Sequence, residues 1–280
     1  MKKILSLALS ALLVASLAVS ASAAAASGAN VTAKTVKTEV KAAAETPVQD
    51  GKIGEYEYAK IDTPEADLYY SESTVKIPFE LYMCYDKDYV YYAIKTNHAT
   101  IKQENDADMS TIWNSDNIQV SVAKADVTTA NKAQRTEFGY ALSSKTGNTL
   151  YYTWADENKT GFKAAASDIK IVIEKNGDAI YEGKIPAKAF GATELKKGDS
   201  YKFMAMVNSI VNGNRQFVEY ATGCAGAVGK DATAHATITL GDAIELPKKA
   251  PETADATSVA VLALAASLAA GYVVVKSKKH

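Results

Sequence analysis

The most restrictive feature of this sequence is a series of short runs of aromatic and β-branched residues, each ended by a turn signal. The clearest case joins residues 169–175 and 179–185 through Asn176-Gly177, a pair that supplies the positive φ angles of a tight hairpin turn. No long segment with a helical period separates such runs. The pattern predicts an all-β fold, an antiparallel β-sandwich of the immunoglobulin or jelly-roll kind. Comparable runs cover residues 79–85, 89–96, 117–122, 136–142, 149–154, 201–207, 216–220 and 234–240.

Two of these runs also predict which side chains are buried. In residues 117–122, Ile118, Val120 and Val122 alternate with polar side chains, which is typical of a strand with one buried and one solvated face. Trp154 ends another run, and its large apolar ring is expected to pack across the sandwich.

The N-terminal end has the pattern of a secretory signal peptide. In residues 1–23, two lysines precede an apolar run, and Ala21-Ser22-Ala23 fits a signal-peptidase cleavage site. We expect a signal helix that is cleaved on export, with an uncleaved N-terminal anchor as the alternative. Residues 24–46 carry no apolar side chain larger than valine, so we expect a flexible linker before a β domain at residues 47–245.

The C-terminal end predicts a transmembrane helix at residues 256–275, because this run has no charge and is long enough to cross a hydrocarbon core. The lysines of residues 276–280 place the tail on the cytoplasmic side. The chain is therefore expected to be exported and held at the cell surface.

A motif in the second linker, residues 246–255, suggests how the chain is attached. Pro251 and Thr253 form a Pro-x-Thr motif ahead of the apolar span and basic tail, an order that resembles the sorting signals recognised by sortases in Gram-positive bacteria. Ala254 stands where those signals have glycine. The resemblance implies attachment to the cell wall by a sortase, and a plain membrane anchor is the alternative.

Composition excludes some classes of function. The net charge of −1 implies no basic face for phosphates, so no nucleic-acid partner is expected. Export permits a disulfide between Cys84 and Cys224, but the apolar run around Cys84 favours a buried thiol. No histidine has the surroundings of a catalytic triad, and no carboxylate pair has a glycosidase pattern, so no enzymatic activity is expected.

Several motifs, in the right order, resemble the family 9 carbohydrate-binding modules and their DOMON-like relatives. This resemblance covers about residues 48–243 and implies a β-sandwich, in agreement with the strand pattern. The motifs are residues 50–56 (DGKIGEY), 86–91 (DKDYVY), 113–120 (WNSDNIQV), 181–186 (YEGKIP), 201–208 (YKFMAMVN) and the closing strand 236–240.

The resemblance also implies a sugar site, in which one ring lies between two tryptophans and is held by a Glu and an Arg. Trp113 matches the first tryptophan, and Gln119 stands at the Glu position. The Arg position falls near Gly139, with Arg135 as the substitute four residues away. The second tryptophan falls near residues 225–229, where this sequence has no aromatic residue.

Two functions remain open from the sequence. The first is a non-catalytic domain that binds a glycan or cell-wall polysaccharide, in support of polysaccharide attachment or breakdown. The second is a structural or adhesive surface protein whose sandwich has lost sugar binding and contacts protein or cell-wall polymer. No cofactor is expected. Related modules hold structural calcium, so the clusters Asp86/Asp88 and Glu104/Asp106/Asp108 are candidate ligands, with solvated turns as the alternative.

Overall fold

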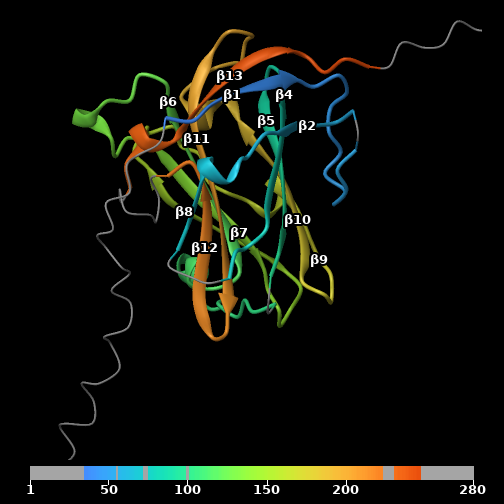
Figure 1. Ribbon diagram of the computed structural model, residues 1–280. Coiled ribbons are helices and arrows are strands. Elements are labelled where there is room, and N and C mark those ends of the chain that lie inside the picture. Colours follow the sequence, from blue (N-terminus) through green and yellow to red (C-terminus); the bar gives the residue numbers. More distant parts are fainter. Residues whose placement is uncertain (1–34, 55, 72–74, 99–100, 223–229, 247–280) are drawn as a thin grey trace, which may run out of the picture. The chain divides into compact units, whose positions relative to one another are not determined.

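The computed structural model describes residues 35–54, 56–71, 75–98, 101–222 and 230–246. Within these residues, thirteen strands form one sheet (Figure 1). The strands are β1 (Lys37–Ala42), β2 (Ala59–Ile61), β3 (Leu68–Tyr70), β4 (Phe79–Tyr85), β5 (Tyr89–Asn97), β6 (Asn117–Lys124), β7 (Thr136–Leu142), β8 (Thr149–Asp156), β9 (Ile169–Ile173), β10 (Asp178–Pro186), β11 (Ser200–Val211), β12 (Asn214–Tyr220) and β13 (Ala236–Ala243). The short 3₁₀ helices are η1 (Glu65–Asp67), η2 (Met109–Asn114), η3 (Thr129–Asn131), η4 (Ala166–Asp168), η5 (Ala187–Phe190) and η6 (Ala232–Ala234).

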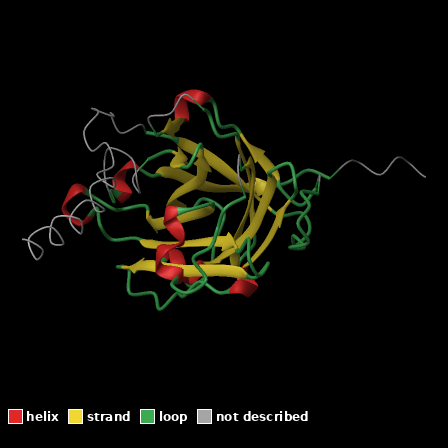
Figure 2. Cartoon of the chain, turned by 90° about the horizontal axis from the view of Figure 1, so that it is seen from below, coloured by secondary structure: helices red, strands yellow, loops and turns green. Residues whose placement is uncertain are grey.

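The all-β prediction is confirmed, but the sheet is mixed rather than purely antiparallel. Its order is β8-β7-β6-β11-β13-β1-β4-β5-β10-β9, and it curls until it is nearly closed (Figure 2). One half, β8-β7-β6-β11, faces the other, β4-β5-β10-β9, and β13 and β1 join them. Strand β1 runs parallel to both of its neighbours, β13 and β4.

Strand β1 corrects the predicted linker. Lys37–Ala42 lie inside the segment that was expected to be flexible, yet they pair with β13 from Lys37 to Ala42. Val36 and Val40 are buried in the main core. Two valines suffice here because strands already stand on both sides of β1. Charged residues surround these valines, so the local sequence does not indicate a strand. Only the pairing with β13 and β4 reveals it.

The core lies between the two halves of the sheet. Phe138 of β7 packs edge-on against Tyr140 and Phe162, with ring centroids 5.8 and 4.9 Å away, and all three are buried. Side chains of β4, β5 and β10 from the opposite half join the same cluster. Burial of this apolar surface, on the order of 25 cal/mol per Å², holds the two halves together.

The hairpin predicted at Asn176-Gly177 is present, with a wider turn than expected. Strand β9 ends at Ile173 and β10 begins at Asp178, and the Gly177 N–H donates to the carbonyl of Glu174 at 2.9 Å. Gly177 has φ +90°, so the loop is a turn followed by a left-handed residue rather than a two-residue primed turn.

The Gly177→Ala variant is expected to lose about 2 kcal/mol of unfolding free energy, because alanine resists the left-handed region and its Cβ meets a backbone carbonyl. That Cβ would lie 2.1 Å from the oxygen of His98. Gly213→Ala is the matched control, since Gly213 also has φ +78° but nothing lies within 4 Å of its added Cβ. Urea denaturation of both variants separates the cost of the clash from that of the left-handed backbone. Equal losses of unfolding free energy in the two variants would contradict a clash at Gly177.

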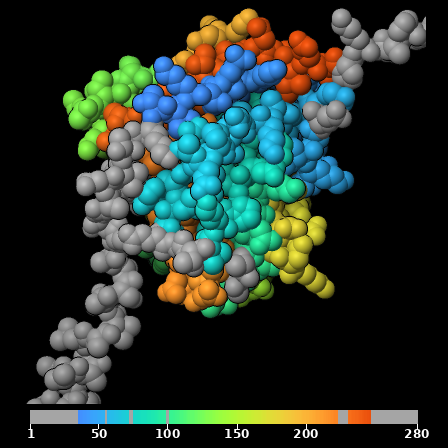
Figure 3. Space-filling model, viewed as in Figure 1, coloured from blue at the N-terminus to red at the C-terminus, as the bar shows by residue number. Residues whose placement is uncertain are grey.

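The predicted terminal elements lie outside the described residues, which Figure 3 shows in colour. These are the signal segment 1–23, the motif at Pro251, Thr253 and Ala254, the apolar run 256–275 and the tail 276–280. Among the residues that are described, no helix has both the length and the apolar character needed to span a membrane.

Candidate functional site

The polar side of β6 is buried, which differs from the solvated face predicted for it. Asn117, Gln119 and Ser121 point away from the main core, yet each is at most 3% exposed. Part of the cover comes from η2, whose Ile112 packs with Ala141 and Leu150 on this outer face. The outer face of this half of the sheet, formed by β8, β7, β6, β11 and β12, is therefore partly covered by η2 and is not fully open to solvent.

Trp154 helps to fix η2 on this face, so the expectation that it packs across the sandwich is wrong. Its Nε1 donates to the carbonyl of Ser110 at 2.9 Å. The six-membered part of its ring lies over Gly139, where an added Cβ would come within 2.7 Å of the indole. Gly139 thus leaves room for the ring, and the ring supports the turn that carries Trp113.

Trp113 remains accessible at this place, with 38% of its surface exposed. The guanidinium carbon of Arg215, from β12, lies 5.3 Å from the centroid of the Trp113 ring and 5.1 Å from that of Phe217. Cation–π contacts of this length favour Arg over Lys, because the planar group can also stack on the ring. Two aromatic rings and one guanidinium thus form the central part of the candidate site.

A chain of hydrogen bonds holds Arg215 in place. Its Nε donates to Oδ1 of Asn208 at 2.7 Å, and Nδ2 of Asn208 donates to Oδ1 of Asn117 at 3.0 Å. Nδ2 of Asn117 then donates to the carbonyl of Ile112 at 2.6 Å, which ties the chain back to η2. Three strands and the turn that carries Trp113 are therefore linked through polar side chains.

Arg215 keeps unused donors. Its Nε is bound to Asn208, but in the described part of the chain its two Nη groups make neither a hydrogen bond nor an ion pair. Burial lowers the pKa of Arg215 to about 10, an effect that the nearby Glu219 opposes, so the guanidinium stays charged near neutral pH. A desolvated fork with free N–H groups suits an oxygen-rich ligand.

Gln119 is a second unused polar group on the same face. It pairs with Met206 on β11 and with Gly139 on β7, one step of the outer face from Asn117. Its side chain is 3% exposed and makes no hydrogen bond within the described residues. Its amide atoms are not among the described side-chain atoms that are buried without a partner, so they reach solvent and are available to a ligand.

Arg135, the third predicted site residue, lies elsewhere. Its Nε and Nη2 both donate to Oε2 of Glu137, at 3.0 and 2.7 Å, and Lys230 contacts the other carboxylate oxygen. Its neighbour Thr136 pairs with Val122, three residues along β6 from Gln119 and thus about 10 Å away. The structure brings Trp113 and Gln119 to the same outer face and places Arg135 at its far end, in an ion pair.

Sequence reasoning missed Arg215 and Phe217 as members of this site. Both lie on β12, and the register Asn208↔Phe217 and Ile210↔Arg215 brings them beside Trp113. The available signal was the Asn212-Gly213 pair, which is typical of a hairpin turn and joins β11 to β12. The region predicted for a second tryptophan, residues 225–229, lies outside the described residues.

The two acidic clusters form turns. Asp86 accepts from the backbone N–H groups of Asp88 and Tyr89, both at 2.8 Å, while Asp108 caps η2 by accepting from the N–H of Ser110 at 3.0 Å. Asp106 accepts from the hydroxyl of Thr146 at 3.1 Å. Across the described ranges, no group of three or more His, Cys, Asp or Glu side chains gathers as a metal site would.

Comparisons with known proteins agree with this fold. No family model matches the sequence, and no curated protein matches it. A family 9 carbohydrate-binding module from Caldicellulosiruptor kristjanssonii, solved with glucose, superposes with a TM-score of 0.54 at 13% identity, over 76% of this chain and 100% of that one. A structure of a family 9 module from the same organism with cellotriose gives 0.53 at 13% identity, over 78% and 100%. The chain is thus similar in fold to this family, as its motifs predicted.

Proposed function

We propose that this domain is a non-catalytic carbohydrate-binding module. The observation that carries the proposal is the group of unused contacts on one outer face, where the exposed ring of Trp113 lies beside the free Nη donors of Arg215. Gln119 adds an amide that has no partner among the described residues and is open to a ligand. The similar family 9 structures hold glucose and cellotriose, which supports the same class of ligand here.

The chemistry of these groups suits a sugar. The exposed face of an indole packs well against the apolar face of a pyranose ring. The two Nη groups of Arg215 form a fork that donates to neighbouring hydroxyls, and the amide of Gln119 both donates and accepts. Because Gln119 carries no charge, the site binds through hydrogen bonds and stacking, and Arg215 supplies its one described cation.

We further propose that the module works outside the cell, in support of polysaccharide attachment or breakdown. The signal pattern of residues 1–23 and the apolar run 256–275 support export and retention at the surface. Attachment through Pro251 and Thr253 by a sortase follows from their position ahead of this run.

One observation favours the alternative of an adhesive or structural role. The guanidinium of Arg215 lies over both Trp113 and Phe217, within 5.3 and 5.1 Å of their centroids, and so covers part of each ring. A partner protein or wall polymer would then contact the outer edge of this surface, and no sugar ring would be held between aromatic faces.

Calorimetric titration of the full chain decides between these functions. The ligands are glucose, cellotriose and a panel of oligosaccharides from cell-wall glycans. We expect saturable binding that weakens about tenfold in Trp113→Ala, since loss of one stacking ring costs about 1.4 kcal/mol. Arg215→Ala is expected to weaken it by a similar factor.

Tyr89→Ala is the matched aromatic control, because Tyr89 is half-exposed at the start of β5, in the opposite half of the sheet. Its affinity should equal that of the unchanged protein, and near-ultraviolet circular dichroism checks that each variant folds. Absence of binding across the panel by the folded protein would rule out the sugar site and support the adhesive role.

A further inference from the structure

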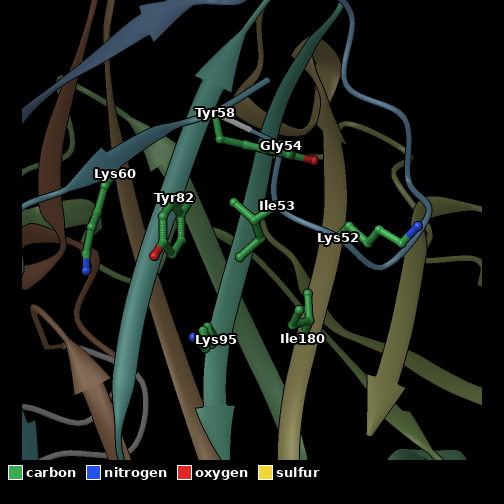
Figure 4. Close-up of a pocket in the computed structure, with 8 residues that line it drawn as sticks. All are labelled: Lys52, Ile53, Gly54, Tyr58, Lys60, Tyr82, Lys95 and Ile180. Carbon is green, nitrogen blue, oxygen red and sulfur yellow. The ribbon is translucent and has the colours of Figure 1, made fainter. Parts of the chain in front are cut away.

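A groove lies on the opposite outer face, over β2, β4, β5 and β10 (Figure 4). It has a volume of about 540 Å³ and continues into a hollow of about 210 Å³ that shares Lys95 and Ile180. The larger groove crosses the sheet from β2 to β10, which is about 14 Å at the usual strand spacing. The side chains used below are Lys52, Ile53, Lys60, Tyr82, Lys95 and Ile180.

One wall of the larger groove is a loop that hydrogen bonds hold in place. The loop that carries Lys52 and Ile53 is held down by Glu182, which is fully buried beneath it. The Gly51 N–H donates to Oε2 of Glu182 at 2.8 Å, and the hydroxyl of Tyr58 donates to Oε1 at 2.7 Å. The groove is therefore a feature of the folded domain, since a buried carboxylate fixes the loop on both of its sides.

The larger groove carries positive charge. Lys52, Lys60 and Lys95 line it, and no carboxylate is among its lining residues, whereas Glu174 and Asp178 line the smaller hollow. Lys60 is paired with Glu80 at 3.1 Å, whereas Lys52 and Lys95 are exposed and take part in no ion pair within the described residues. Figure 4 shows Lys60 and Lys52 on opposite sides of the groove, with Lys95 on β5 between them.

Between the lysines lies a surface that suits sugar rings. The Tyr82 ring is half-buried, and Lys60 lies 5.6 Å from its centroid, at the edge of the groove. Ile53 and Ile180 add partly exposed aliphatic surface beside it. Strand register places Ile180 directly beside Lys95, so an apolar contact and an ammonium group lie next to each other across β10 and β5.

We propose that this groove is a second binding site, for an anionic polysaccharide. The polymer lies across the strands in the larger groove, its ring faces contact Tyr82 and the isoleucines, and its acidic groups contact Lys52 and Lys95. Carboxylates of uronic acids and phosphates on sugars share this chemistry, because both offer a fixed negative charge to an ammonium donor. The site is separate from that of Trp113, which lies on the other outer face of the sandwich.

Binding of the full chain to four polymers tests this site. The probes are polygalacturonate, phosphomannan, neutral mannan and poly-L-glutamate, measured by biolayer interferometry at low and at physiological ionic strength. We expect at least one anionic polysaccharide to bind, and the one that binds identifies carboxylate or phosphate as the group recognised. Affinity should fall as salt rises, since exposed charges are screened.

The Lys52→Gln/Lys95→Gln double variant is expected to weaken that binding about tenfold, while Lys188→Gln, which removes an exposed lysine on η5, should change it less than twofold. Trp113→Ala should leave it unchanged, so failure of this site and failure of the first site are distinguishable. The proposal is overturned by equal binding of neutral mannan or poly-L-glutamate, by a double variant that binds normally, or by no binding at all.

Discussion

The Glu137→Ala variant is expected to unfold with about 3–5 kcal/mol less free energy than the unchanged protein, because it leaves a buried cation without its partner. Glu137 is 1% exposed and Arg135 is 7% exposed. Both Nε and Nη2 of Arg135 depend on the carboxylate of Glu137, which also accepts from Lys230. Removal of Glu137 therefore exposes the full desolvation cost of the Arg135 guanidinium.

The pKa of Glu137 adds a pH signature to this result. Burial alone would raise it, but Lys230 and Arg135 outweigh burial and hold the pKa below its ordinary value. The unfolded state therefore takes up its proton first as the pH falls. The stability from this carboxylate is present above the unfolded pKa, near 4.3, and is lost as the pH falls through the lower folded pKa.

Urea denaturation at pH 7 measures the effect, with Glu104→Ala as the control. Glu104 pairs with Lys145 at 3.6 Å, but both side chains are more than half exposed, so its removal should cost about 0–1 kcal/mol. Equal losses in the two variants would show that the Arg135–Glu137 pair is not structural. In that case, Arg135 would again be a candidate for ligand binding.

The second large effect is a loss of stability in mild acid that depends on His235. Burial lowers its pKa to about 4, and the Arg135 and Lys202 cations add to this effect while the Thr222 carbonyl and Glu137 oppose it. Its Nδ1 bonds the Thr222 carbonyl at 2.9 Å and its Nε2 contacts the Ser121 hydroxyl at 2.8 Å. A neutral imidazole satisfies both bonds, with Nδ1–H donating to the carbonyl and Nε2 accepting from the hydroxyl.

The sign follows from where protons bind. Below pH 6.5 the unfolded chain takes up a proton on this histidine, whereas in the folded protein the His235 imidazole stays neutral until about pH 4. Stability therefore falls as the pH drops through this window, by on the order of 3 kcal/mol. His98 is less suitable for the test, because burial also raises the pKa of its neighbour Asp116 to about 6, and that group stabilises the folded state as it gains a proton.

Comparison with His235→Gln isolates the contribution. Glutamine can keep an N–H donor and an oxygen acceptor but does not titrate in this range. Chemical denaturation at intervals from pH 7.5 to 4 should show the unchanged protein losing about 3 kcal/mol more than the variant. Parallel curves for the two proteins would mean that His235 is not the group responsible.

Much of the sheet could be predicted from the sequence. Strand β4 was predicted as residues 79–85 and β7 as 136–142, with the bounds that the structure shows. These elements are visible because alternating apolar residues and local turn signals act within a few positions. Strand β1 was missed because its pattern is weak and its stability comes from β13 and β4, far along the chain.

The residues of the candidate site divide in the same way, into those that a local motif identifies and those that only the fold brings together. Trp113 and Gln119 were identified from a local motif, and the structure places both on the outer face of one half of the sheet. Arg215 was not identified, since it reaches Trp113 only through the register of β12 against β11. Arg135 was proposed because it lies only four residues from Gly139 in the sequence. In the structure its guanidinium instead pairs with Glu137, two residues away along the chain.

By itself, then, the sequence determined the all-β class, most of the strands and one aromatic residue of the site, because alternation and turn chemistry are local properties. Tertiary structure alone decided the parallel insertion of β1, the burial of the polar side of β6, and which arginine lies beside Trp113. Each of these depends on strand pairings between distant segments of the chain or on the register of a hairpin, and register is set by packing of the whole sheet.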